Sequence, residues 1–293
     1  MTPSRTDTLP VPAWTLAVAA MFSVQLGSAL SLPLISEVGP AGTAWLRLSA
    51  GALMFLVIAR PPLRSVHRGD IPALIGLGVT IGLLTTFFLA AITRIPLGTA
   101  VAIEFLGPLG VAALRAHTRR ALMWPALALV GVLLLTEPWH GSVNLPGIGL
   151  AAGAALGWAS YILLTQHIGD RFTGINGLSL SIPVAAATAA VAGIPQAAGH
   201  ITAETLAIAV GLAVLLPVLP FALEMAALRH MTHTAFGTLM ALEPAIGVVL
   251  GLVILHQKPS PVQVVGISLV VLAGALAQRG GRRRRDVTPP YPP

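Results

Sequence analysis

Four charged residues stand inside otherwise apolar stretches of this sequence: Arg47, Glu104, Glu224 and Glu243. A charge is costly to place in an apolar stretch, so such residues are candidates for binding an ion or a polar solute. Two like charges about 4 Å apart repel by about 4 kcal/mol even at an effective dielectric constant of about 20. If the carboxylates share one cavity, we therefore expect at least one to hold a proton at neutral pH unless a cationic ligand is present.

A carboxyl group for which a proton and an ammonium group compete is the simplest device for exchanging one for the other. We predict this role for Glu104 or Glu243, which both fall in the middle of an apolar stretch. The alternative is that the four charged residues pair with one another and hold helices together. Arg47 and Glu224 lie nearer the ends of their stretches, where long side chains can also reach the lipid headgroups.

Prolines surround the same residues and predict irregular helices. Pro108 follows Glu104 by one helical turn, and Pro244 directly follows Glu243. A proline inside a helix clashes with the carbonyl group four residues earlier. We expect further breaks at Pro217 with Pro220, near Glu224, and at Pro183. Carbonyl groups exposed by such kinks are tolerated only against protein or a watery cavity. Kinks that merely shape the packing are the alternative.

Two aromatic residues, Trp158 and Tyr161, follow a glycine-rich helical face and can line a cavity, although ordinary packing is the more common use of such residues. Catalytic signals are missing: the sequence has no H-E-x-x-H, G-x-S-x-G or P-loop motif, and no cysteine. His230 and His233 lie in a short turn and resemble no metal site. We therefore expect no enzyme activity, no metal and no cofactor.

The elements that position these residues are membrane-spanning helices. Of the 293 residues, 55% are hydrophobic and 9% charged, whereas soluble domains carry about 25% charged residues. The mean hydropathy is +0.85. A spanning helix needs about 20 mostly apolar residues. We predict an all-α membrane protein with about ten transmembrane helices, near residues 14–32, 42–59, 71–92, 97–115, 121–136, 147–166, 175–194, 206–228, 234–255 and 261–277.

The basic residues predict the orientation of these spans. Of the 17 Lys and Arg residues, Arg47 lies within a span and only Arg94 and Lys258 fall in one set of loops. The others fall in the opposite loops and at the termini, which places both termini in the cytoplasm by the positive-inside rule. A cleaved signal peptide at the first span is the alternative, but a second apolar run follows within a few residues.

The chain also repeats itself at a shift of 136 positions. At this shift Leu106-Gly107-Pro108 coincides with Leu242-Glu243-Pro244, and Pro125 coincides with Pro261. Because each copy holds five spans, an odd number, the second copy enters the membrane upside down. Inverted five-helix repeats are typical of secondary transporters, with the substrate site between the halves. We predict a cytoplasmic N-terminus at 1–11, repeats at 12–136 and 147–277, and a disordered basic, proline-rich tail at 278–293.

Several stretches resemble the EamA family of the drug/metabolite transporter superfamily, and within it the threonine and homoserine exporters of the bacterial inner membrane. The stretches are TAWLRL at 43–48, PLGTAVAIEFLGPL at 96–109, GWASYIL at 157–163, LEMAAL at 223–228 and FGTLMALEPA at 236–245. The resemblance implies export of small neutral amino acids, driven by the proton gradient. One departure is the sequence LHQK at 255–258, where relatives often carry a Gly-Glu pair.

A zwitterionic amino acid suits the predicted charges, since Arg47 can hold its carboxylate and Glu104 or Glu243 its ammonium group. The expected partners are thus this substrate, protons and the lipid bilayer. The basic tail is expected to lie against anionic lipids, and no nucleic-acid partner is expected. Efflux of other metabolites or drugs, such as purines or cationic compounds, is the nearest alternative.

Overall fold

The computed structural model describes residues 12–59, 67–115, 119–139, 143–169 and 175–280, and in these ranges the only regular elements are helices. The predictions for the N-terminal segment 1–11 and for residues 281–293 of the tail lie outside the described residues. The first half contains α1 (Ala13–Ala29), α2 (Ser31–Ala59), α3 (Ile71–Ile92), α4 (Leu97–Glu104), α5 (Leu106–Arg115), η2 (Arg119–Leu122) and α6 (Met123–Thr136).

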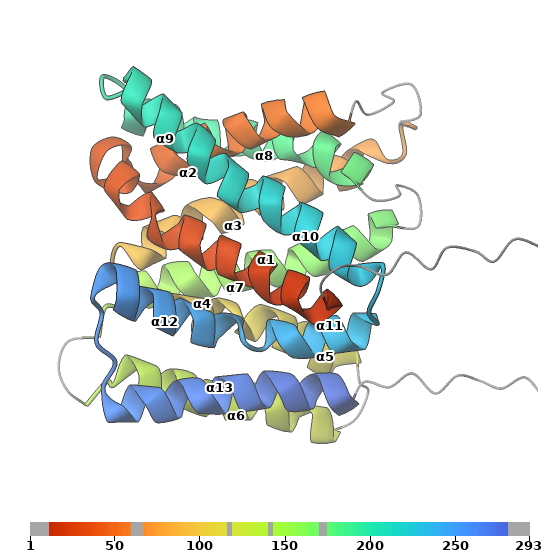
Figure 1. Ribbon diagram of the computed structural model, residues 1–293, viewed down its shortest axis with the longest axis vertical. Coiled ribbons are helices and arrows are strands. Elements are labelled where there is room, and N and C mark those ends of the chain that lie inside the picture. The colour runs from red at the N-terminus through yellow and green to blue at the C-terminus, as the bar shows by residue number, and fades with distance from the viewer. Residues whose placement is uncertain (1–11, 60–66, 116–118, 140–142, 170–174, 281–293) are drawn as a thin grey trace, which may run out of the picture.

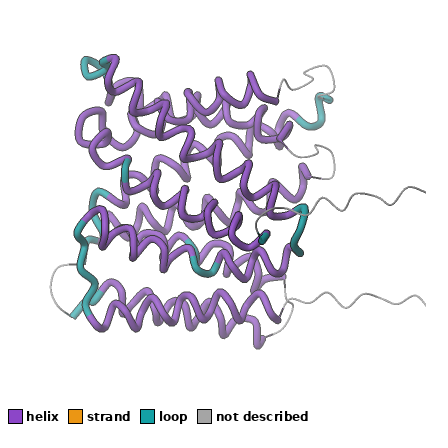
Figure 2. Tube along the Cα trace, viewed as in Figure 1, coloured by secondary structure: helices purple, strands orange, loops and turns teal. Residues whose placement is uncertain are grey.

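The second half contains α7 (Leu145–Gly169), α8 (Ile175–Ala197), α9 (Ala203–Ala213), the π-helical turn η3 (Val214–Val218), α10 (Leu219–Leu228), α11 (His233–Met240), α12 (Glu243–Leu255) and α13 (Pro261–Gly280). Because α13 continues to Gly280, the first residues of the predicted tail are helical. Figure 2 shows how short the connecting loops are compared with the helices.

In the described part of the chain, seven helices are long and apolar enough to cross a membrane, with α4–α5, α9–α10 and α11–α12 each counted as one. Three shorter apolar helices, α1, α6 and α13, accompany them. Together they coincide with the apolar runs of the sequence, so the protein is a multi-pass α-helical membrane protein, and the model is consistent with ten crossings. Large apolar side chains such as Leu53, Leu156 and Val191 are exposed, as expected for surfaces that face lipid.

Three of the long helical segments are interrupted where prolines occur. The helix α4 ends at Glu104, and α5 begins at Leu106. In a continuous helix Pro108 would clash with the carbonyl group of Glu104, one turn earlier. The helix α11 ends at Met240, and α12 begins at Glu243. The shift of 136 positions places Glu104 on Met240, so the two breaks are equivalent. The third interruption is η3, where Leu216, before Pro217, has φ −159° and ψ 112°.

The prediction of a helix break at Pro183 is wrong. Pro183 does not interrupt α8, which continues through it to Ala197. The loss of one hydrogen bond is tolerated because α8 packs against α2 and α3 along the same stretch. The helix α2 begins at Ser31, before the apolar run 42–59, and turns at Gly39. Gly39 has φ 73°, which other residues rarely adopt, and Pro40 then starts the main part of the helix.

The contacts between the halves come in matched sets, as two repeats related by a two-fold axis require. The helix α2 packs against α8, α4 against α12 and α6 against α13, and each of these pairs joins equivalent helices. The contact of α3 with α7 is matched by that of α1 with α10. The first helices of the two halves, α1 and α7, run in opposite directions (Figure 1). The start of α1 and the end of α13 lie on the same side of the molecule (Figure 1).

Candidate functional site

A cavity of about 270 Å³ lies between the two halves and brings the predicted site residues together. Its volume is just below the range of about 300–1,000 Å³ that is common for small-molecule sites, so it suits a small solute. All four in-span charged residues line it, together with Trp158, Tyr161, Pro217 and Pro220. Pro108 and Pro244 do not line the cavity. They lie beside the helix breaks at Glu104 and Glu243, which do line it.

The helix breaks place two of the carboxyl groups on the cavity wall. Glu104 is the last residue of α4, and Glu243 is the first residue of α12. The amino end of a helix stabilises negative charge and the carboxyl end does not, so the two glutamates occupy electrostatically opposite positions. Glu224, on α10, is the third carboxyl group of the wall. All three therefore come from helices that prolines interrupt.

None of the four charged side chains pairs with another of them. In the described residues the only contact between oppositely charged groups within 4.0 Å is that of His67 with Asp70, at 3.8 Å, before α3. Arg47 is 3% exposed, and its guanidinium donates one hydrogen bond of 3.3 Å to the hydroxyl of Ser31. The alternative that Arg47 pairs with a glutamate to hold helices together therefore does not describe this structure.

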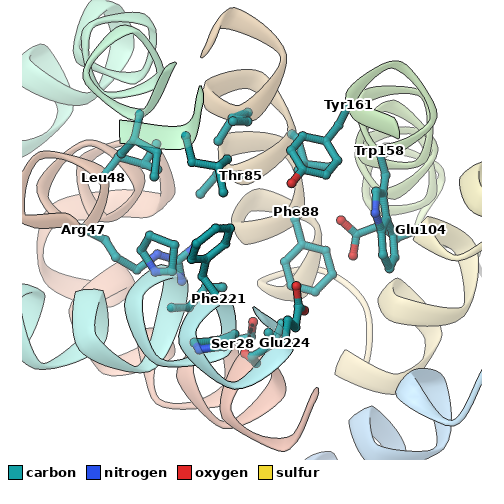
Figure 3. A pocket seen from close by; sticks show the side chains of 18 of the residues that line it. Ser28, Arg47, Leu48, Thr85, Phe88, Glu104, Trp158, Tyr161, Phe221 and Glu224 are labelled. Carbon is teal, nitrogen blue, oxygen red and sulfur yellow. Dashed lines mark hydrogen bonds between the residues drawn. The ribbon is translucent and has the colours of Figure 1, made fainter. Parts of the chain in front are cut away.

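The positive and negative groups lie on different walls of the cavity (Figure 3). Arg47 enters from one side, whereas Glu104 lies on the other beside Trp158. The hydroxyl of Tyr161 points into the space between them, and Glu224 lies below it in this view. The indole ring of Trp158 is held edge-on by Phe105, with ring centroids 6.2 Å apart. Such a cavity can hold a solute with one anionic and one cationic end, separated by a short apolar part.

Sequence reasoning missed three polar residues of the cavity wall: Gln25, Ser28 and Thr85. Gln25 is 2% exposed, and its amide Nε2 donates a hydrogen bond of 3.3 Å to Oε1 of Glu243. A lone glutamine in the apolar run 14–32 is itself a signal, because its side-chain amide is costly to bury without a partner. No group of three or more His, Asp or Glu side chains suited to a metal ion occurs within the described ranges.

Comparison with known proteins places the chain in a family. It is 34% identical to "Threonine/homoserine exporter RhtA" of Escherichia coli (strain K12), over 90% of this chain and 91% of that protein. The protein of the same name from Salmonella typhimurium (strain SL1344) is also 34% identical, over 92% and 93% of the two chains. Residues 145–277 match the profile of the EamA-like transporter family. The chain belongs to the EamA-like transporter family.

A solved structure supports the fold of this EamA-like transporter. A chain titled "Crystal structure of protein" superposes with a TM-score of 0.61 and covers 92% of this chain and 99% of that one. The identity is 20%, so this likeness concerns the fold alone. The family membership indicated by the sequence motifs is thus confirmed by the relatives.

Proposed function

We propose that this protein exports small neutral amino acids of the threonine and homoserine type across the bacterial inner membrane, by exchange for protons. The observation that carries the proposal is a cavity lined by an Arg and three Glu residues that form no ion pair with one another. A zwitterion supplies the missing partners, because its carboxylate can bind Arg47 and its ammonium group can bind a glutamate. The relatives named threonine/homoserine exporters support this substrate class.

In this proposal the central cavity lies between the inverted repeats 12–136 and 147–277, and both termini are cytoplasmic. A proton and the substrate ammonium group compete for Glu104 or Glu243, so that binding of one releases the other. Alternating access then follows from rocking of one repeat against the other around the cavity. Trp158 and Tyr161 shape the cavity around the short side chain of the substrate.

The substrate class is tested by following labelled threonine and homoserine in cells with and without overexpression of the protein. We expect overexpression to lower their intracellular accumulation and to do so only while a proton gradient is present. A parallel panel of purines and cationic drugs tests the alternative substrates. Lowered accumulation of those compounds, with no change for amino acids, would contradict the proposal.

The coupling role is tested by Glu104→Gln, which keeps the shape of the side chain and removes its charge. We expect the variant to insert and fold normally but to lose proton-coupled export. The matched control is Glu204→Gln, because Glu204 is exposed at the start of α9, away from the cavity. Export at the wild-type rate by Glu104→Gln would exclude the role of Glu104.

A further inference from the structure

The polar contact between Gln25 and Glu243 leaves two acceptor atoms without partners. Gln25 Nε2 donates to Glu243 Oε1, while Gln25 Oε1 and Glu243 Oε2 are buried and have no hydrogen-bond partner. Both residues line the cavity, and they are only 2% and 6% exposed. Buried polar atoms in proteins nearly always have a partner, so each unpartnered acceptor needs an explanation. We explain two such acceptors, on side chains that are hydrogen-bonded to each other, by a ligand that donates hydrogen bonds.

We propose that Gln25 and Glu243 together form the ammonium-binding end of the cavity, and that Gln25 selects substrates with a primary ammonium group. An ammonium group has three N–H donors and a positive charge, so it can bond to both free oxygens and neutralise the carboxylate. This inference rests on the proposed amino-acid transport. Of the two candidate glutamates, it names Glu243 as the one that binds the ammonium group.

The position of each glutamate on its helix supports the choice of Glu243. Glu243 begins α12, and the amino end of a helix favours negative charge. Glu104 ends α4, where the helix offers no such stabilisation, and Gln25 donates its hydrogen bond to Glu243. The helix geometry therefore favours Glu243 over Glu104 as the partner of a cationic group.

The surroundings hold Gln25 in place for this role. The hydroxyl of Ser23 donates a hydrogen bond of 2.7 Å to the carbonyl oxygen of Leu215, which ties α1 to the irregular turn η3. The hydroxyl of Ser28 bonds to the carbonyl oxygen of Val24 in its own helix, at 2.9 Å, and so does not compete for Gln25. Arg47 provides the opposite end of the site, with Ser31 beside its guanidinium.

The test is equilibrium binding of labelled threonine to the purified full-length protein, with competition by two analogues. One analogue, 3-hydroxybutanoate, lacks the ammonium group, and the other, 1-aminopropan-2-ol, lacks the carboxylate. We expect Gln25→Met, which has a similar length and no acceptor oxygen, to weaken threonine binding about ten- to hundredfold. Binding of 3-hydroxybutanoate should be unchanged, because it does not use this end of the site.

The matched control is Met21→Leu, a change of similar volume one turn earlier on α1, at a buried residue that does not line the cavity. We expect it to bind threonine as the wild type does. Threonine affinity unchanged by Gln25→Met, or an equal loss for threonine and 3-hydroxybutanoate, would overturn the assignment while leaving amino-acid transport intact. No binding of threonine or homoserine to the wild type would instead overturn the proposed function itself.

A second measurement needs no variant of the protein. The N-trimethyl derivative of threonine keeps the positive charge but has no N–H group to donate. We expect the wild-type protein to bind it at least about tenfold more weakly than threonine, because Gln25 Oε1 and Glu243 Oε2 would remain unpartnered. Equal affinity for the two compounds would show that charge alone is recognised and would overturn the role of Gln25.

Discussion

At the level of single residues, Arg47 shows that the cavity is suited to binding a ligand and does not stabilise the fold. Its guanidinium is buried, yet it bonds only to the neutral hydroxyl of Ser31. A buried charge without an ionic partner destabilises the folded protein, because the lost hydration is not replaced. Residues kept at such a cost are expected to gain their partner from a substrate.

We therefore expect Arg47→Met to abolish the binding of carboxylate substrates without lowering stability. Replacement of buried charges by apolar residues is often neutral or stabilising by about 1–4 kcal/mol. Thermal unfolding of the purified protein and binding of labelled threonine measure the two effects. The control is Arg229→Met in an exposed turn, which should retain binding. A marked loss of stability in Arg47→Met would mean that the guanidinium holds the helices together.

At the level of helices, glycines decide how closely the spans approach. The helix α5 lies so near α7 that a Cβ atom on Gly107 would clash with the carbonyl oxygen of Ala155. Gly78 and Gly82 make the same kind of close approach from α3 to α8, whereas a Cβ atom on Gly247 of α12 would come nearest the side chain of Val101 on α4, at 3.1 Å. These are the small-residue contacts of membrane helices, and here they lie within one chain.

The variant Gly107→Ala should lower stability, because the added methyl group forces α5 away from α7. We expect a loss of about 1–3 kcal/mol, the usual cost of overpacking. Gly110→Ala, three residues later on the same helix, is the matched control, since a Cβ atom there meets nothing within 4 Å. It should be neutral or stabilising by up to about 1 kcal/mol, as alanine favours the helix. Equal midpoints of thermal unfolding for both variants would contradict this close packing.

For the whole molecule, the orientation in the membrane follows from the basic loops and stays a prediction. Arg68 and Arg94 lie at opposite ends of α3, and both are exposed. Because the protein has no cysteine, a single introduced cysteine can be labelled without background. We expect Arg94→Cys to react with a membrane-impermeant maleimide in intact spheroplasts, and Arg68→Cys to react only after permeabilisation. The reverse result would place the termini outside.

Much of the architecture is local and could therefore be predicted from the sequence. Hydropathy marks the spans because each helix in a membrane must satisfy its own backbone and present apolar side chains. The breaks after Glu104 and Met240 follow from Pro108 and Pro244, which act on the carbonyl group four residues earlier. The charged residues within the spans could be recognised because the free energy of placing a charge in the bilayer depends on its depth.

Other features depend on contacts between distant segments, and only the tertiary structure decided them. The local pattern wrongly predicts a break at Pro183, because it contains no information on the packing of α2 and α3 against α8. The packing of the two halves against each other brings four charged residues into one cavity without ion pairs between them: Arg47, Glu104, Glu224 and Glu243. The bond between Gln25 and Glu243 joins the first span to the ninth, and no spacing along the chain encodes such a contact. Hydropathy and proline act over one or two helical turns, whereas the site is formed where the repeats meet.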